Sequence, residues 1–422
     1  MDIFKTFRYI VYGFKRAMFY FPINHKIPIL AQNKFMQKIS SLLFVFFLIL
    51  SSAQGKRFFE TGDVQLNNPV EKINLNYAND LPLVKVSING KSYNFLFDSG
   101  APTVISNAIY TELNLEKEHT SKVKDSQKNK QEQIFTTLPE MMVDHIIFKN
   151  IGVIVMELNG SELGCFKIDG ILGANQMAKL FWRVNYSENS LEATKDLANF
   201  KVDDYETIVP FDPQPQKTPI IETKILDKNI KLTFDTGFTG RIKILDNDYD
   251  PKKIKKSVET YGINSVGAFG AGKPVSGFIF KIPELGFGNK SFGNEMIMTG
   301  NSRLIGNDFF KDFTFVMDWQ NKKIYMKKIK NNPPTLESFG FGYRFIDAKP
   351  VVAFVFKEKG TSLEIGDSIL SINDVDLEHL NNESACHYMM NRVEKDYKTI
   401  GIRIKRAGKV MDLRLDKKEY LD

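Results

Sequence analysis

An internal repeat, which ends each time in Asp-Ser/Thr-Gly, constrains the fold of this chain more than any other feature. Residues 81–100 read LPLVKVSINGKSYNFLFDSG and residues 218–237 read TPIIETKILDKNIKLTFDTG, and the two align without a gap. Each copy has an alternating strand, a turn predicted at Asn89-Gly90 or Asp227-Lys228, and a second strand that ends in Phe. The repeat therefore predicts two β-hairpins of like design.

A second shared element follows each hairpin at a similar distance. It is Ile171-Leu172-Gly173 in the first copy and Leu304-Ile305-Gly306 in the second. The intervals are rich in strand-forming residues, so we expect a mainly β protein with two lobes, over 64–200 and 205–328. The polar, charge-mixed run 116–133 is expected to be a solvated loop of the first lobe.

The two motif aspartates, Asp98 and Asp235, are the candidate catalytic residues. Two facing carboxylates cannot both ionise cheaply, so they share one proton and act as base and acid toward a water between them. Gly100 and Gly237 allow tight turns that bring the backbone close to the carboxylates. The hydroxyls beside the aspartates can exchange hydrogen bonds between the lobes. The motif pair therefore predicts peptide hydrolysis without a metal or cofactor.

The region over residues 80–326 resembles the pepsin/retropepsin superfamily of aspartic peptidases. FLFDSGAPTVIS resembles the retroviral-type site, and LTFDTGFTGRIKI resembles the bacterial retropepsin-like form. The resemblance implies a two-lobed β-barrel peptidase in which Asp98 and Asp235 form the dyad. It further implies that Ser99 and Thr236 form a cross-lobe hydrogen-bonded grip. It also implies that the glycine after two apolar residues packs beside each catalytic loop, which assigns that role to Gly173 and Gly306.

The chain departs from pepsins at two kinds of position. Ala101 and Phe238 stand where pepsins carry Ser or Thr directly after the motif glycine. The glycine-rich run 266–272 is our candidate for a mobile flap hairpin, with a plain loop as the alternative. No flap can be located in the first lobe from the sequence.

Residues 335–418, which we call the C-terminal module, follow the linker signal Asn331-Asn332-Pro333-Pro334 and resemble a bacterial PDZ domain. Residues 363–373, LEIGDSILSIN, match that family's core, and 383–395 read as the helix beside its groove. The resemblance implies an α+β fold and a peptide-binding loop whose backbone amides take a C-terminal carboxylate, at Phe341, Gly342, Tyr343, Arg344 and Phe345. A non-binding copy used for packing is the alternative.

The net charge of +7 does not indicate a nucleic-acid partner, because residues 1–53 alone account for +6 of it. This leader contains the basic Lys38, the apolar run Leu42–Leu50 and the small residues Ser51-Ser52-Ala53. The pattern predicts a signal peptide cleaved after Ala53, possible translation from Met36, and export to a periplasm or the outside. An uncleaved membrane anchor is the alternative.

The remaining residues narrow the function further. Cys165 and Cys386 fall in different predicted domains and form no disulfide framework, and no Cys/His cluster has metal-ligand spacing. We therefore predict a monomeric aspartic endopeptidase that acts on polypeptides. The competing hypothesis is a catalytically inactive peptide-binding protein of the same fold.

Overall fold

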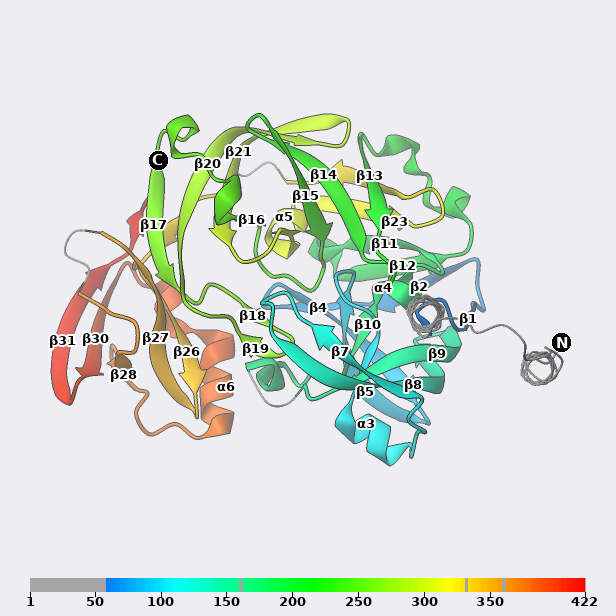
Figure 1. Ribbon diagram of the computed structural model, residues 1–422, viewed down its shortest axis with the longest axis horizontal. Coiled ribbons are helices and arrows are strands. Elements are labelled where there is room, and N and C mark those ends of the chain that lie inside the picture. Colours follow the sequence, from blue (N-terminus) through cyan, green and yellow to red (C-terminus); the bar gives the residue numbers. More distant parts are fainter. Residues whose placement is uncertain (1–57, 159–161, 331–332, 359–361, 422) are drawn as a thin grey trace, which may run out of the picture. The chain divides into compact units, whose positions relative to one another are not determined.

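The computed structural model describes residues 58–158, 162–330, 333–358 and 362–421, all within one compact unit, Lys56–Asp422 (Figure 1). The described part is mainly β. Within it, no helix is long and apolar enough to cross a membrane. The leader 1–53, with its predicted cleavage site, and the linker residues 331–332 lie outside the described residues. The domain limits given above stay predictions.

In the first lobe, the predicted hairpin consists of β4 (Leu81–Ile88) and β5 (Lys91–Asp98). Asn89 and Gly90 form its turn with φ of 49° and 77°, a left-handed pair that suits a two-residue hairpin. Strand β10 (Gly170–Gly173) lies parallel to β5 and places Gly173 opposite Asp98. The apolar-apolar-Gly triplet is thus hydrogen-bonded directly beside the first Asp strand.

The second lobe repeats this arrangement with β14 (Pro219–Ile225), β15 (Lys228–Phe234) and β22 (Leu304–Ile305). One detail of our prediction is wrong. Ile225 pairs with Lys228, so the turn residues are Leu226 and Asp227 rather than Asp227-Lys228. Leu226 has a φ of 57° and occupies the place of Asn89, so strand pairing holds an unfavourable residue in the left-handed region.

A sheet of six strands, three from each lobe, joins the two halves of the molecule. The first lobe contributes β2, β12 and β11, and the second contributes β23, β24 and β13. The central pairing aligns Trp182 of β11 with Met317 of β23. The bounds are β2 (Val70–Asn74), β11 (Phe181–Asn185), β12 (Ser190–Thr194), β13 (Thr207–Pro213), β23 (Phe313–Asp318) and β24 (Lys323–Lys328).

Apart from two long hairpins, the other described strands and α-helices of the two lobes complete the barrels around buried apolar side chains. They are β1 (Asp63–Gln65), β3 (Asn76–Ala78), β6 (Val104–Ser106), β9 (Ile146–Met156), β16 (Ile242–Leu245), β21 (Lys290–Gly300), α3 (Asn107–Glu112), α4 (Ala174–Met177) and α5 (Asn307–Phe310).

Each lobe also extends a long hairpin, and the tips of the two hairpins touch. The first-lobe hairpin is β7 (His119–Lys124) with β8 (Lys130–Val143), so the expected loop over 116–133 is largely a polar strand pair. The second-lobe hairpin is β17 (Ser257–Gly262) with β20 (Val275–Phe287), and its tip carries β18 (Val266–Gly267) and β19 (Gly270–Ala271). Figure 1 shows β18 and β19 beside β7.

Hydrogen bonds join the two hairpin tips. The backbone N–H of Phe269 donates to Asp125 Oδ2 at 3.0 Å, and Asn129 Nδ2 donates to the backbone oxygen of Ala271 at 3.3 Å. Asp125 also accepts from the backbone N–H groups of Gln127 and Asn129, which fixes the turn of its own hairpin. Polar residues that the sequence predicted to lie in a solvated loop therefore hold one hairpin against the other.

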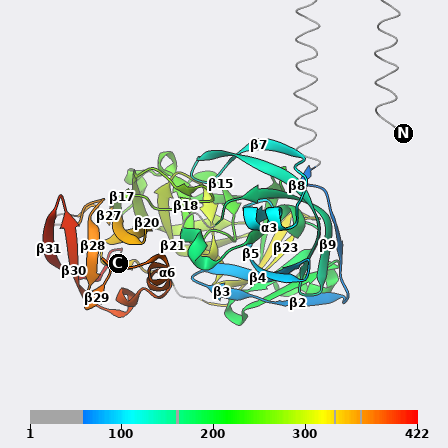
Figure 2. The same cartoon turned by 90° about the horizontal axis from the view of Figure 1, so that it is seen from below.

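The C-terminal module contains a small sheet and one helix with their own buried core. Strand β27 pairs with β26 on one side (Figure 1). On the other side its end pairs with β17 of the second-lobe hairpin, and Figure 2 shows β17 and β27 next to each other. The bounds are β25 (Glu337–Ser338), β26 (Phe341–Ile346), β27 (Lys349–Phe356), β28 (Ser368–Ile372), β29 (Val375–Asp376), α6 (Asn382–Asn391), β30 (Thr399–Arg406), β31 (Lys409–Asp416) and β32 (Lys418–Glu419). The module therefore continues the sheet of the second-lobe hairpin.

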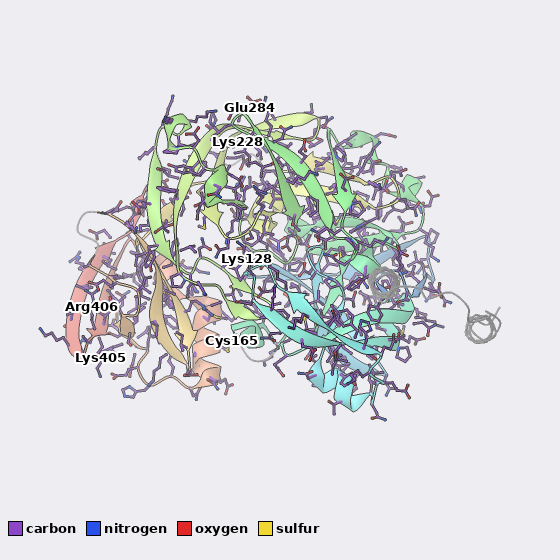
Figure 3. All side chains as sticks on the ribbon, in the orientation of Figure 1. Lys128, Cys165, Lys228, Glu284, Lys405 and Arg406 are labelled. Atoms are coloured by element: carbon purple, nitrogen blue, oxygen red, sulfur yellow. A yellow bond between two sulfur atoms is a disulfide. The ribbon has the colours of Figure 1, made fainter. Side chains whose placement is uncertain are left out.

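A disulfide joins the module to the first lobe and corrects our interpretation of the cysteines. Cys165, in the 3₁₀ helix η1 (Glu162–Phe166), is bonded to Cys386 of α6, 221 residues away in sequence. Figure 3 shows Cys165 next to α6. The cysteines do lie in different predicted domains, and sequence separation alone gave no sign that folding brings these domains together. The module is thus attached to both lobes.

Removal of this disulfide is expected to destabilise the protein. A cross-link that closes so long a loop restricts the unfolded chain, and its loss typically costs about 2–5 kcal/mol. We expect the Cys165→Ser/Cys386→Ser variant to melt at a lower temperature than the oxidised wild type. Wild type melted in a reducing agent should show a similar decrease, and melting temperatures that do not differ would contradict this prediction.

Candidate active site

The two motif aspartates lie at equivalent ends of the repeated hairpins and meet at the interface of the lobes. Asp98 ends β5, and Asp235 follows β15 directly. The backbone N–H of Asp235 donates to Ile305 O at 3.0 Å, which ties the second loop to its apolar-apolar-Gly triplet. Asp98 keeps 8% of its surface exposed. The structure therefore brings together two residues that stand 137 positions apart.

Ser99 and Thr236 form a reciprocal set of cross-lobe hydrogen bonds. The hydroxyl of Ser99 donates to Phe234 O at 2.7 Å, and the hydroxyl of Thr236 donates to Phe97 O at 2.8 Å. In return, the Ser99 N–H donates to Thr236 Oγ1 at 2.9 Å and the Thr236 N–H donates to Ser99 Oγ at 3.1 Å. Both side chains are fully buried. Each hydroxyl is thus used twice, and the set fixes the separation of the two loops.

The motif glycines leave room for the facing carboxylates. A Cβ on Gly100 would come within 2.5 Å of Asp235 Cγ, and one on Gly237 would come within 2.4 Å of Asp98 Cγ. The Gly100 N–H donates to Asp98 Oδ1 at 2.7 Å, and the Gly237 N–H donates to Asp235 Oδ1 at 2.9 Å. Any larger residue at either position would push the two carboxyl groups apart.

Gly173 and Gly306 lie where the backbones of neighbouring loops cross. A Cβ on Gly173 would stand 2.1 Å from the carbonyl carbon of Pro102, and one on Gly306 would stand 2.2 Å from Phe238 O. Because these nearest atoms are backbone atoms, they cannot rotate away as a flexible side chain could. The two positions accordingly support the loops that carry the aspartates.

Burial and mutual repulsion set the protonation of the pair. Burial raises the pKa of Asp98, although backbone N–H groups, chiefly that of Gly100, partly offset the effect. Burial raises the pKa of Asp235 well above its usual range, and repulsion from Asp98 raises it further. The two carboxyl groups are in hydrogen-bond contact. The pair can therefore hold one shared proton, as an acid–base pair acting on water requires.

These pKa directions predict an activity maximum in weak acid to near-neutral solution. The active form carries one proton on the pair, and raised pKa values keep that proton bound to higher pH. Ala101 and Phe238 supply no hydroxyl that would favour the ionised carboxylates. The pH dependence of kcat/KM on a peptide substrate tests this. A maximum in strong acid, with activity already lost as the pH rises to about 5, would contradict it.

Asn307 and Tyr186 support the second loop and were not identified from the sequence. Asn307 Nδ2 donates to the backbone oxygens of Thr236, at 2.8 Å, and Asp80, at 2.7 Å. Its own Oδ1 accepts from the buried hydroxyl of Tyr186 at 2.8 Å. Asn307 directly follows Gly306, and this adjacency to the triplet is the signal that could have indicated it.

The tip of the second-lobe hairpin packs on an apolar cluster of the first lobe. Ala268 and Phe269 at the tip, and Ala101 just after the first motif, join a buried cluster that includes Val104 and Ile171. The glycine-rich run 266–272 is therefore a hairpin tip in contact with the surroundings of the first catalytic loop. The polar hairpin β7–β8 is its partner, which the sequence did not reveal.

The residues proposed for peptide binding in the C-terminal module do not form a loop. Phe341, Gly342, Tyr343, Arg344 and Phe345 lie in strand β26, because each faces a residue of β27 in an antiparallel pair. The preceding turn contains Gly340, with a φ of 80°. The expected loop thus begins before Phe341, and the named residues form the strand beside it.

Among the described residues there is no group of three or more side chains suited to hold a metal ion. A family model described as Aspartyl protease matches residues 84–176, which span the first Asp motif and the first triplet. No curated protein matches the chain. The comparisons do not identify a PDZ domain in the C-terminal module. Residues 84–176 are thus an aspartyl protease domain of the retropepsin-like kind, and polypeptides are the substrates that such a domain implies.

Proposed function

We propose that this protein is an aspartic endopeptidase in which Asp98 and Asp235 together activate one water for attack on a peptide carbonyl. The carboxyl groups are in contact and carry raised pKa values, and Asp98 is buried while Asp235 is partly exposed. One carboxylate takes a proton from the water while the other, protonated, donates to the carbonyl oxygen. The pair acts as a unit, so no fixed proton is assigned to either residue.

The single observation that carries this proposal is the reciprocal hydrogen bonding of Ser99 and Thr236. Binding of a peptide in a cleft does not require the two loops to be fixed to each other. Acid–base action on one water does, because one carboxyl group must reach the water while the other reaches the carbonyl oxygen that the water attacks. A rigid, symmetric connection directly beside the two aspartates therefore favours hydrolysis over the alternative, a catalytically inactive binding protein.

Digestion of a peptide library by the purified protein over a range of pH values tests the proposal. Cleavage products are expected from the wild type and are expected to be missing with Asp98→Asn. Binding of library peptides by folded wild type without any cleavage would instead support the inactive binding protein.

For the C-terminal module we propose a PDZ-like role in which a peptide adds as a strand to β26. Strand β26 pairs in antiparallel register with β27 on one side, and the peptide would add along its other edge. The rings of Phe345 in β26 and Tyr388 in α6 lie 6.4 Å apart, so the strand and the helix are close to each other. Because β27 also pairs with β17, a peptide there can influence the second-lobe hairpin as well as recruit substrate.

Binding of peptides to the full-length Asp98→Asn protein tests the role of the module. If β26 takes a C-terminal segment, peptides with a free carboxylate should bind more tightly than the same peptides with an amidated end. Equal binding of both forms, or none, would leave the module with a packing role. A deletion of the module is a poorer test, since Phe356 and Tyr420 share a core with Val258 of the second-lobe hairpin.

We further propose that the protein is exported, to a periplasm or outside the cell. The disulfide between Cys165 and Cys386 supports this, because such bonds persist in oxidising compartments and are rare in the cytosol. N-terminal sequencing of the protein from its native host is expected to begin at Gln54. A sequence beginning at Met1 or Met36 would contradict cleavage after Ala53.

A further inference from the structure

The two lobes share one design, but at one equivalent position they carry different types of residue. In the first lobe, Val104 of β6 lies opposite Ile171, the first residue of its triplet. In the second lobe, Lys243 of β16 lies opposite Leu304, which is the first residue of the other triplet. Both also pair in parallel with the strand that follows the long hairpin, β9 or β21. Lys243 therefore takes the place that Val104 holds in the first lobe.

In the first lobe this position is part of an apolar surface. Val104 belongs to the buried cluster that contains Ile154 and Ile171, and Ala101 packs against it. Ala101 is the residue directly after the first Asp-Ser-Gly motif. The first lobe thus presents only apolar side chains at this position beside its catalytic loop.

In the second lobe the same position carries a buried positive charge. Lys243 is 1% exposed, and its Nζ lies 5.4 Å from the ring centre of Phe238, the residue directly after Asp235-Thr236-Gly237. The ammonium donates to the backbone oxygen of Asn264 at 3.4 Å and to Asn264 Oδ1 at 3.2 Å. Among the described residues, no carboxylate lies within ion-pair distance of it. Burial alone accordingly lowers the pKa of Lys243 to about 8.

A buried ammonium without a carboxylate is costly, and an apolar residue here would avoid that cost. The equivalent Val104 shows that the fold itself does not need a lysine at this position. Asn264, which holds the ammonium, lies just after β17, between the second-lobe hairpin and its tip. A substrate that displaced this tip together with Asn264 would uncover Lys243 as well.

We propose that Lys243 determines specificity, by pairing with an acidic side chain, Asp or Glu, of a substrate bound against Phe238 in the second lobe. This inference rests on the proposed peptidase activity. A carboxylate would supply the charged partner that the ammonium lacks, and the ion pair would be screened from water by the returning hairpin. Charge-assisted hydrogen bonds of this kind are about twice as strong as neutral ones. The apolar first lobe offers no such partner, so the preference is confined to one side of the cleaved bond.

Cleavage of matched substrates tests this proposal. A peptide library digested by wild type should show Asp or Glu enriched at one position. Two synthetic peptides that differ only by Glu or Gln at that position are then compared. We expect the wild type to favour the Glu peptide by about tenfold or more in kcat/KM. The ratio should fall toward one in Lys243→Met and should be largely retained in Lys243→Arg, whatever the absolute rates.

Binding gives a second measurement that does not depend on turnover. The Asp98→Asn protein should bind the Glu peptide more tightly than the Gln peptide, and Lys243→Met in that background should remove the difference. Equal Glu and Gln values in wild type, or a ratio that Lys243→Met leaves unchanged, would overturn the proposal and leave Lys243 as a structural tie to Asn264. Failure of folded wild type to cleave any library peptide would instead overturn the peptidase activity itself.

Discussion

Replacement of either Asp98 or Asp235 by Asn is expected to lower kcat/KM on peptide substrates by at least about a thousandfold. The two carboxyl groups share one proton, so one acts as base only while the other acts as acid. Asn can neither take the proton from water nor donate one to the substrate carbonyl. Since the pair functions as a unit, the double variant should be scarcely less active than either single variant.

The same substitutions are expected to leave the fold intact and to stabilise it at neutral pH. The pKa of Asp235 is raised in the folded protein, so the folded state binds more protons than the unfolded state between the two pKa values. Stability therefore falls as pH rises through that interval. Asn carries no proton to lose, so the variant avoids this decrease. Its advantage over wild type should be small in strong acid and largest at neutral pH.

Kinetics and thermal melts of the same preparations separate these effects. The expected pattern is loss of cleavage together with a melting temperature at neutral pH equal to or above that of wild type. A purified single variant that still cleaves at a rate near that of wild type would contradict the dyad. Loss of cleavage together with a lower melting temperature at every pH would show that the aspartates serve the fold instead.

The repeated hairpins and triplets could be predicted because their signals are local. Alternation of apolar residues indicates the strands, and the left-handed turn residues Asn89 and Gly90 mark the first hairpin. The matched spacing of the two triplets then indicates two like lobes. Leu226 shows the limit of such signals, because its side chain gives no indication of the turn that strand pairing imposes on it.

Contacts between distant segments could not be read from the sequence. The run 116–133 is polar because its hairpin is exposed along most of its length, and nothing in its composition identifies Asp125 as the acceptor for Phe269. Cys165 and Cys386 pair only because the module packs beside the first lobe. In the sequence, Lys243 looks like an ordinary strand lysine, and only the fold shows that it lies beside Phe238. In each case the function of the residue depends on a neighbour that only the fold supplies.

Loss of the Thr236 hydroxyl is expected to weaken both the fold and the catalytic site. Thr236→Val keeps the shape of the side chain but removes the donor to Phe97 O and the acceptor for the Ser99 N–H. Each buried polar group left without a partner costs about 1–3 kcal/mol, so for two such groups we expect the free energy of unfolding to fall by about 2–6 kcal/mol.

The effect of this variant on activity follows from geometry rather than from chemistry, because Thr236 carries no proton for the reaction. When the first loop is held less firmly to the second, the two carboxylates can move relative to each other. A displacement of about 1 Å can lower the rate about a hundredfold. Thr236→Ser is the matched control, since it retains the hydroxyl and should keep both the melting temperature and kcat/KM close to wild type. Denaturant unfolding and peptide kinetics on both variants test this. If Thr236→Val and Thr236→Ser behave alike, the hydroxyl is not what holds the two loops in register, and packing of the side chain alone must do so.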